Sequence, residues 1–229
     1  ARRKRNQGRL KNLKKLKDQK KAFNPRSGTA NMKLASETKS GEIVINAKNL
    51  NKTFVEKCVV SDFSIKIKRG DRIGIVGPNG IGKTTLLKIL LGEAQPDCGT
   101  IKLGTNLIIA KFDQMREQLN LENSLLQNLI DDPDVKSAGG AGQIIVRGKS
   151  KHVAGYLKEF LFSEFQFRSP VKSLSGGEKA RLLLAKIMAK ESNLLVLDEP
   201  TNDLDLESLD LLQEVIADYP GTVLLVSHD

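Results

Sequence analysis

The sequence predicts an α/β domain with a mainly parallel core sheet, and three observations lead to this fold class. Three apolar runs, 72–76, 194–197 and 222–226, have the length and type of strands buried in parallel sheets. A helical pattern at 208–218 separates the last two runs, which is the order of a β–α–β unit. A glycine-rich loop that leads into a helix at 84–91 directly follows the first run.

Residues 1–40 carry the whole excess of positive charge and predict a basic helical segment in front of the domain. The chain of 229 residues has a formal net charge of +10, but residues 1–40 hold fourteen Lys and Arg against two acidic residues. The remainder therefore has 23 basic and 25 acidic residues. Leu10, Leu13 and Leu16 recur every three residues between the lysines. Either these leucines pack on a partner helix, or the segment 1–26 binds a polyanion such as nucleic acid.

A change of composition at Gly41 marks the start of the folded domain, predicted to span 41–229. The segments 41–50 and 58–67 alternate apolar and polar residues and predict strands of an antiparallel layer. No apolar run approaches the roughly 20 residues of a membrane span, and no signal-peptide pattern is present. The two cysteines have no metal-like spacing, so the composition favours a cytoplasmic protein with reduced thiols and no membrane contact.

The loop GPNGIGKTT after the first buried strand predicts a site for nucleotide phosphates. Its glycines let backbone N–H groups approach phosphate oxygens, and the following helix directs its positive N-terminal end at them. Lys83 is expected to reach the β- and γ-phosphates of ATP, and the Thr84 hydroxyl to bind Mg²⁺. The nucleotide-binding residues predicted in this loop are Gly77, Pro78, Asn79, Gly80, Ile81, Gly82, Lys83, Thr84 and Thr85.

Polar residues at the ends of three further apolar segments could complete this site. Asp198 ends a buried strand and is predicted to ligate Mg²⁺, while Glu199 is placed to activate water as a general base. Gln114 follows an apolar strand at 107–112 and could reach both the metal and the water. His228, after the last strand, could contact the γ-phosphate and assist catalysis. The alternatives are turn chemistry for the acidic pair and ordinary surface side chains for Gln114 and His228.

Taken in order, these motifs resemble an ATP-binding-cassette (ABC) domain of the P-loop NTPase fold. LSGGE at 174–178 matches the signature motif of such domains, and Asn202-Asp203-Leu204-Asp205 matches their D-loop. The stretch ARRKRNQGRLKNL resembles part of the linker between the two cassettes of ABC-F proteins, so 41–229 is similar to their C-terminal cassette. HVAGYLKEFLF and DEPTNDLD are similar to the Uup branch of that family. The resemblance implies a helical lobe at about 121–171. It also implies that the chain is a fragment that stops just after His228, the histidine of the H-loop.

The resemblance also implies a partner cassette. Two cassettes pair head to tail in this family, and each ATP lies between the phosphate loop of one and the SGG turn of the other. A plain helix cap by Ser175 is the alternative for that turn. Phe54 falls where the family stacks an aromatic ring on adenine, although its strand pattern is equally compatible with core packing. The residues that would bind the ATP held by the partner are Ser175, Gly176, Gly177 and Glu178.

The predicted activity is hydrolysis of Mg-ATP, weak in a single isolated cassette because each chain has one phosphate loop and one SGG turn. The resemblance implies that this cycle acts on the ribosome, on ribosomal RNA or on branched DNA. An ATPase subunit of a membrane transporter is one alternative, but such subunits need no basic linker. An SMC- or Rad50-like DNA-repair ATPase is another, but a long coiled coil separates the two motifs there. The glycine-rich segment 135–150 predicts a loop and hairpin without an assigned role.

Overall fold

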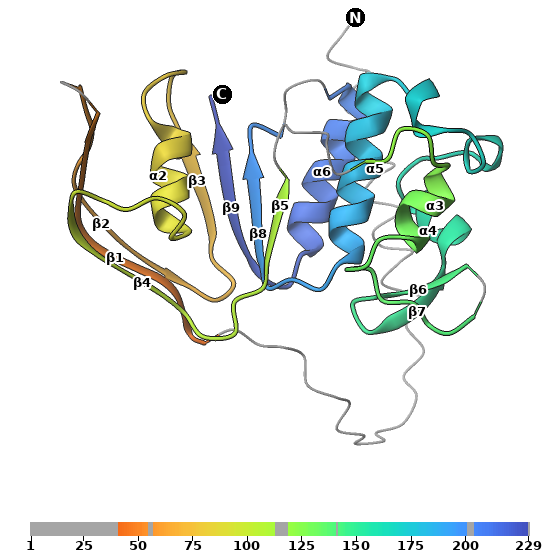
Figure 1. The fold of residues 1–229 in the computed structure, drawn as a ribbon, viewed down its shortest axis with the longest axis horizontal. Coiled ribbons are helices and arrows are strands. Elements are labelled where there is room, and N and C mark those ends of the chain that lie inside the picture. Colours follow the sequence, from red (N-terminus) through yellow and green to blue (C-terminus); the bar gives the residue numbers. More distant parts are fainter. Residues whose placement is uncertain (1–40, 55–56, 113–118, 141, 201–203, 229) are drawn as a thin grey trace, which may run out of the picture. The chain divides into compact units, whose positions relative to one another are not determined.

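A four-stranded parallel sheet forms the centre of the domain, as the apolar runs predict. The computed structural model describes residues 41–54, 57–112, 119–140, 142–200 and 204–228, which all belong to one compact unit, Thr38–Asp229. The strands lie in the order β3 (Arg72–Val76), β9 (Thr222–Ser227), β8 (Leu194–Asp198) and β5 (Ile109–Phe112), and each neighbouring pair is parallel. Their carboxyl ends meet at one edge of the sheet, the upper edge in Figure 1.

Different layers cover the two faces of this sheet, because side chains alternate between the faces along each strand. Helix α2 (Lys83–Leu90) lies on one side, and helices α5 (Gly176–Ala189) and α6 (Leu206–Asp218) lie on the other (Figure 1). The sheet side chains that pack with α2 are Leu194, Val196, Leu224 and Val226. Those that pack with α5 and α6 are Leu195, Leu197 and Val223.

A three-stranded antiparallel sheet packs beyond α2, with β1 (Ile43–Phe54) between β2 (Lys57–Lys68) and β4 (Cys98–Leu103). Its inner face is apolar: Ile45 and Ile67 face each other across β1 and β2, and both are fully buried. The sequence alternation predicts β1 and β2, but β4 was not predicted. This layer closes the core around α2 and brings Val59 of β2 close to the loop in front of that helix.

The segment between β5 and α5 forms a lobe of short elements. It contains α3 (Leu125–Ile130), the hairpin of β6 (Gln143–Val146) and β7 (Lys149–His152), α4 (Val153–Glu159) and two 3₁₀ turns, Glu164–Gln166 and Val171–Ser173. Leu125, Leu129, Val153, Leu157 and Val171 are fully buried in the same cluster as the apolar side of α5. The lobe therefore supports α5 and positions the turn at which α5 begins.

The predicted fold class is confirmed: the domain has a parallel core sheet, an antiparallel layer and helices on both faces. None of the helices in the described parts of the chain is long and apolar enough to cross a membrane. The basic segment 1–40, Gln114 and the D-loop residues Asn202 and Asp203 lie outside the described residues.

Candidate active site

The phosphate loop connects the carboxyl end of β3 to the start of α2, where the sequence predicts a nucleotide site. Gly82 immediately precedes α2 and has φ 112° and ψ 15°, a left-handed conformation that favours glycine. A Cβ atom at Gly82 would lie 2.0 Å from Cγ1 of Val59, on β2. The loop therefore requires glycine at this position for two reasons, its backbone conformation and the close approach of the antiparallel sheet.

Lys83 is buried in this loop, with 8% of its surface exposed. Its Nζ donates a hydrogen bond of 2.7 Å to the Gly77 carbonyl and lies 3.1 Å from Oε1 of Glu199, at the end of β8. A buried ammonium group needs such partners, because its charge is costly to remove from water. The structure thus brings together the predicted phosphate-binding lysine and the predicted general base, which are far apart in the sequence.

Glu199 connects this lysine to His228. Its Oε2 lies 2.7 Å from Nδ1 of His228, which directly follows β9. Glu199 has φ 48°, an uncommon left-handed conformation for a residue with a side chain, and strain of this kind often marks functional sites. Burial raises the pKa of Glu199, but hydrogen bonds and charge from His228 and Lys83 outweigh burial and hold the pKa below its ordinary value. The carboxylate is therefore ionised and able to accept a proton.

Two side chains with oxygen atoms that can ligate a metal, Thr84 and Asp198, lie in the same site as Glu199. Oγ1 of Thr84 donates a hydrogen bond of 3.3 Å to Oδ2 of Asp198, so two of the three predicted Mg²⁺ ligands are neighbours, and the third, Gln114, lies outside the described residues. In the described parts of the chain no cluster of three or more His, Cys, Asp or Glu side chains could enclose a metal. This donor set fits Mg²⁺, which binds few protein oxygens and completes its coordination with phosphate and water.

The SGG turn starts α5 and is well ordered by its own side chains. The Glu178 amide donates to Oγ of Ser175 (3.2 Å), and the Ser175 amide donates to Oε2 of Glu178 (2.8 Å), which is a complete capping box. Gln166 fixes the glutamate further, because its Nε2 donates to Oε1 of Glu178 (2.7 Å). The helix-cap alternative for Ser175 is thus observed. The amides of Gly176 and Gly177, in the first turn, have no intrahelical acceptors and remain for a ligand.

Phe54 ends β1 and is not a core residue. Half of its surface is exposed, and Nζ of Lys52 lies 5.4 Å from the centre of its ring. The core-packing alternative is therefore wrong. Phe54 pairs with Lys57 at the start of β2, and Val59, two residues further along β2, lies against Gly82, so this end of the antiparallel sheet is the end that approaches the phosphate loop.

Sequence reasoning missed two residues that shape these loops. Val59 limits the space at Gly82, and Gln166 holds Glu178 in the capping box. Val59 gives no signal in the sequence, because it looks like any apolar residue of a strand. Gln166 could have been suspected only from its nearness to the signature, and its contact depends on how the 3₁₀ turn folds.

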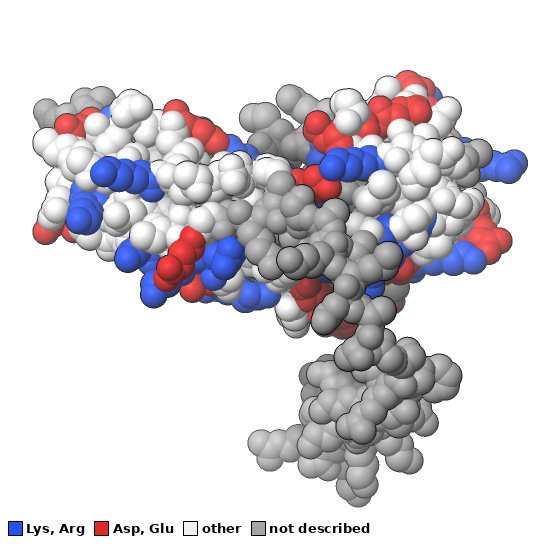
Figure 2. Space-filling view, turned by 90° about the horizontal axis from the view of Figure 1, so that it is seen from below, with Lys and Arg blue, Asp and Glu red and all other residues white. Residues whose placement is uncertain are grey.

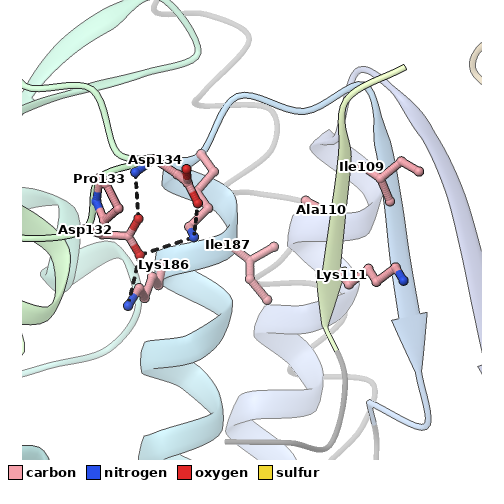
Figure 3. Close-up of a pocket in the computed structure, with 9 residues that line it drawn as sticks. Ile109, Ala110, Lys111, Asp132, Pro133, Asp134, Lys186 and Ile187 are labelled. Atoms are coloured by element: carbon pink, nitrogen blue, oxygen red, sulfur yellow. Dashed lines mark hydrogen bonds and ion pairs between the residues drawn. The ribbon is translucent and has the colours of Figure 1, made fainter. Parts of the chain in front are cut away.

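A cavity of about 480 Å³ lies elsewhere, between the edge strand β5 and the lobe (Figure 3). Asp132 points toward Nζ of Lys186 on α5 (2.9 Å) and Nζ of Lys190, the residue that follows α5 (3.2 Å). Burial raises the pKa of Asp132, but the hydrogen bond from Lys186 and further contacts bring that pKa below its ordinary value. These ion pairs attach the lobe to α5, and none of the lining residues belongs to the phosphate loop.

The site combines a glycine-rich loop after β3, a buried lysine, and an acidic pair at the end of β8, which is separated from β3 by β9 in the same sheet. This combination defines a P-loop nucleotide-binding site. The antiparallel layer, the lobe and the SGG turn make the domain an ATP-binding cassette. Comparison with known proteins agrees with this class: the sequence profile of a family described as ABC transporter matches residues 60–202.

Two individual relatives show which type of ATP-binding cassette the chain is. The ATP-binding protein Uup of Caulobacter vibrioides is 52% identical over 230 residues, which cover 100% of this chain and 37% of that protein. The energy-dependent translational throttle protein EttA of Haemophilus influenzae is 34% identical, over 90% of this chain and 36% of that protein. The chain belongs to the ABC transporter family and, with these relatives, to its ABC-F type. It spans little more than a third of the length of either relative.

A solved structure supports the fold. A dimeric ATP-binding cassette in a post-hydrolysis state, bound to ADP and Pi, matches with a TM-score of 0.59 and 24% identity. The match covers 81% of this chain and 88% of that one. At this identity the likeness concerns the fold alone.

Proposed function

We propose that the chain binds Mg-ATP at the loop 77–85 and hydrolyses it, with Glu199 as the general base. The observation that carries this proposal is the position of Lys83 Nζ, between the Gly77 carbonyl (2.7 Å) and Oε1 of Glu199 (3.1 Å). One ion pair therefore joins Lys83, which is expected to bind the phosphates, to Glu199, which is expected to activate water. Such an arrangement makes nucleotide binding and the state of the base interdependent.

The ion pair indicates how ATP prepares the base for reaction. The phosphates of ATP carry negative charge and can replace Glu199 as the counter-charge of Lys83. Glu199 keeps its 2.7 Å contact with His228, which orients the carboxylate, and can then accept a proton from the attacking water. Thr84 and Asp198 would hold Mg²⁺, which supplies charge neutralisation at the phosphates. Gln114 is proposed to contact this metal and the water, and the exposed Phe54 ring to stack on adenine.

A second cassette is proposed to complete the site. The start of α5 offers the amides of Gly176 and Gly177, which have no acceptors within the helix and could bind a phosphate held by the partner. Ser175 and Glu178 already fix the shape of this turn through the capping box. The cassette of similar fold that is described as dimeric and bound to ADP and Pi supports pairing. The partner is either the other cassette of a longer protein or a second copy of this chain.

The target of the cycle is proposed to be ribosomal RNA or DNA, contacted through the segment 1–26. The support is the charge of the first 40 residues and the printed name of the relative EttA, a translational throttle protein. The basic segment 1–26 argues against the transporter alternative, because the ATPase subunit of a membrane transporter needs no such linker.

The test of the catalytic proposal is Glu199→Gln. We expect ATP turnover to fall by about 10²- to 10⁴-fold, because the amide cannot accept the proton. ATP affinity, measured by titration with a fluorescent ATP analogue, should stay the same or increase, since the variant leaves Lys83 without a competing carboxylate. Glu214→Gln, on the exposed side of α6, is the matched control and should turn ATP over normally. Unchanged turnover in Glu199→Gln would show that another group acts as the base.

Pairing is tested by dilution. If the SGG turn of a second copy completes the site, the rate per chain rises with protein concentration and then saturates. A rate per chain that is brisk and constant at every dilution would exclude pairing as a requirement.

The nucleic-acid contact is tested by salt. Replacing Arg2, Arg3, Lys4 and Arg5 with Gln should reduce the slope of log affinity against log salt by about 3 to 4, roughly 0.9 for each lost phosphate contact. An unchanged slope would remove these four residues from the interface, and an unchanged affinity after deletion of residues 1–26 would remove the whole segment.

A further inference from the structure

The outer face of the antiparallel sheet carries lysines in a regular arrangement. Lys66 on β2 and Lys102 on β4 both pair with Asn46 on β1, so the three side chains form one row across the sheet. Lys48 lies two residues along β1 from Asn46, and Lys68 two residues along β2 from Lys66, which places both on the same face. All four lysines are exposed, whereas the intervening Ile45, Ala47 and Ile67 are buried.

These four lysines differ from most other lysines of the domain. In the parts of the chain that the structure describes, none of the four has a carboxylate oxygen within 4.0 Å. The described lysines with such a carboxylate are Lys52, Lys83, Lys111, Lys136, Lys151, Lys158, Lys172, Lys186 and Lys190. Like charges on one sheet face repel each other, so this arrangement has a cost that an acidic ligand would remove.

The acids at the rim of this face are occupied. Asp62 accepts a hydrogen bond from Nδ2 of Asn49 (2.7 Å), and Asp71 accepts one from the backbone amide of Lys68 (2.8 Å). Figure 2 shows Lys and Arg side chains over the part of the molecule that holds the antiparallel sheet, with acidic side chains beside some of them. The lysine face, defined as Lys48, Lys66, Lys68 and Lys102, is therefore a patch of uncompensated positive charge on a rigid support.

We infer that the lysine face binds the phosphate backbone of a double-helical nucleic acid. Neighbouring strands lie about 4.8 Å apart and alternate residues about 6.8 Å apart. Lys68 and Lys48 lie on opposite sides of the row formed by Lys66 and Lys102, so the backbone positions of the four lysines span roughly 10 Å across the strands and roughly 14 Å along them. Flexible lysines on this grid can reach several phosphates of one duplex, which carries a charge every 1.7 Å or so along its axis. Asn46, Ser64 and Thr100 share the face and add hydrogen-bond donors of the kind that contact phosphate and sugar.

The same face argues against a single-stranded ligand. Single strands are bound largely by stacking of bases on aromatic side chains. The aromatic residue of these strands nearest to the lysines, Phe63, packs with the cluster beneath the sheet instead of lying in the lysine rows. The face therefore contacts the backbone and has no means of reading bases, so it should bind RNA and DNA duplexes irrespective of their sequence.

The experiment uses the full chain without nucleotide, so that its result does not depend on the ATP site. The face variant replaces Lys48, Lys66, Lys68 and Lys102 with Gln. The control variant makes the same charge change away from the antiparallel sheet, at Lys88 on α2, Lys149 and Arg168 in the lobe and Lys179 on α5, described cations for which no carboxylate partner within 4.0 Å is found. Affinity for a DNA duplex of random sequence, and for an RNA duplex of the same length, is measured between about 50 and 200 mM salt.

We expect the face variant to reduce the slope of log affinity against log salt by about 3 to 4 on both duplexes, and the control variant by less than about 1. Equal losses in the two variants, or no loss in the face variant, would overturn the inference. So would a face variant that loses binding to phosphatidylserine vesicles but keeps duplex binding, because the face would then serve a membrane surface.

A second variant distinguishes the loss of charge from damage to the fold. Lys→Arg at the same four positions keeps the charge and should keep the slope, whereas a lost slope in this variant would contradict a contact based on charge. The effect of the face variant should add to that of the substitutions at residues 2–5, because the two groups of cations contact separate phosphates. Failure of the contact through residues 1–26 would leave the expectation for the lysine face unchanged.

Discussion

Helices α2 and α5 both begin at a glycine-rich loop, but they satisfy their first amide groups in opposite ways. At α2 the residue before the helix is Gly82, and no side chain caps the helix. At α5 the residue before the helix is Ser175, and Ser175 and Glu178 form a complete capping box. Both helix starts have the composition of an anion site, so composition alone does not distinguish them.

The difference teaches which half of a nucleotide site each loop can supply. The loop before α2 surrounds a buried lysine and leaves its helix uncapped, so it gains most from a ligand that fills it. The loop before α5 is already stabilised by its own side chains and needs no ligand to keep its shape. A preorganised turn of this kind suits the addition of a few hydrogen bonds to a ligand held elsewhere, since little ordering remains to be done on binding.

The largest expected contrast comes from the same substitution at the two loops. Gly82→Ala should lower the free energy of unfolding by about 2 to 4 kcal/mol, because Ala is strained at φ 112° and its Cβ would meet Val59. Gly176→Ala lies in the first turn of a helix and should raise the free energy of unfolding by up to about 1 kcal/mol. Urea unfolding of both variants measures these changes.

A second substitution separates the two causes at Gly82. Val59→Ala removes Cγ1, the atom 2.0 Å from the added Cβ, so the double variant should recover part of the loss. The remaining loss reports the left-handed backbone. If Gly82→Ala and Gly176→Ala change stability equally, the contrast drawn between the two loops is wrong.

Removal of the helix cap at Ser175 is expected to give the next largest change in stability. Ser175→Ala removes the acceptor of the Glu178 amide and should lower the free energy of unfolding by about 1 kcal/mol. Ser175→Thr retains an acceptor oxygen and should remain close to the original chain. Because Ser175 and Glu178 act together, the loss in Ser175→Ala with Glu178→Ala should be smaller than the sum of the single losses. A strictly additive pair would contradict the capping box.

The strands at the centre of the domain were predictable, whereas the third strand of the outer layer was not. β8 and β9 are short runs of mostly buried apolar residues, and β3 is a short apolar run at the edge of the sheet. The predicted bounds of these three strands differ from the observed ones by one residue at most. β4 contains Gly99, with a positive φ, and only two apolar residues with a strand-like spacing. Its pairing with β1 depends on residues about 50 positions away, which a local pattern does not contain.

The site was predictable as a set of residues but not as a network. The phosphate loop and the acidic pair can be recognised from the sequence, because their residue types and their order along the chain are those of a nucleotide site. The contacts of Glu199 with Lys83 and His228 exist because three parallel strands end at the same edge, and their lengths and directions come only from the folded sheet. The same is true of the lysine face, whose members come from three strands and form no charge run in the sequence.

The smallest expected effect is a pH dependence confined to the α5 loop. A hydrogen bond from the Ser175 amide lowers the pKa of Glu178; burial opposes it, while Gln166 and the charge of Arg181 add to the lowering. A carboxyl group whose pKa is lower in the folded state stabilises the fold above its unfolded pKa of about 4.3. That stabilisation is lost as the pH falls through the lower, folded value.

Glu178→Gln keeps an acceptor for the Ser175 amide but removes the charge, so it isolates this contribution. At pH 7 the variant should be less stable by under about 1 kcal/mol, because the side chain is partly exposed to solvent. The difference should shrink as the pH is lowered from about 5 to 3, whereas Glu214→Gln on α6 serves as the matched exposed control. A difference between Glu178→Gln and the original chain that stays constant or grows over this range would mean that the capping box holds the glutamate by shape alone. The two helix starts would then differ in hydrogen bonding but not in charge.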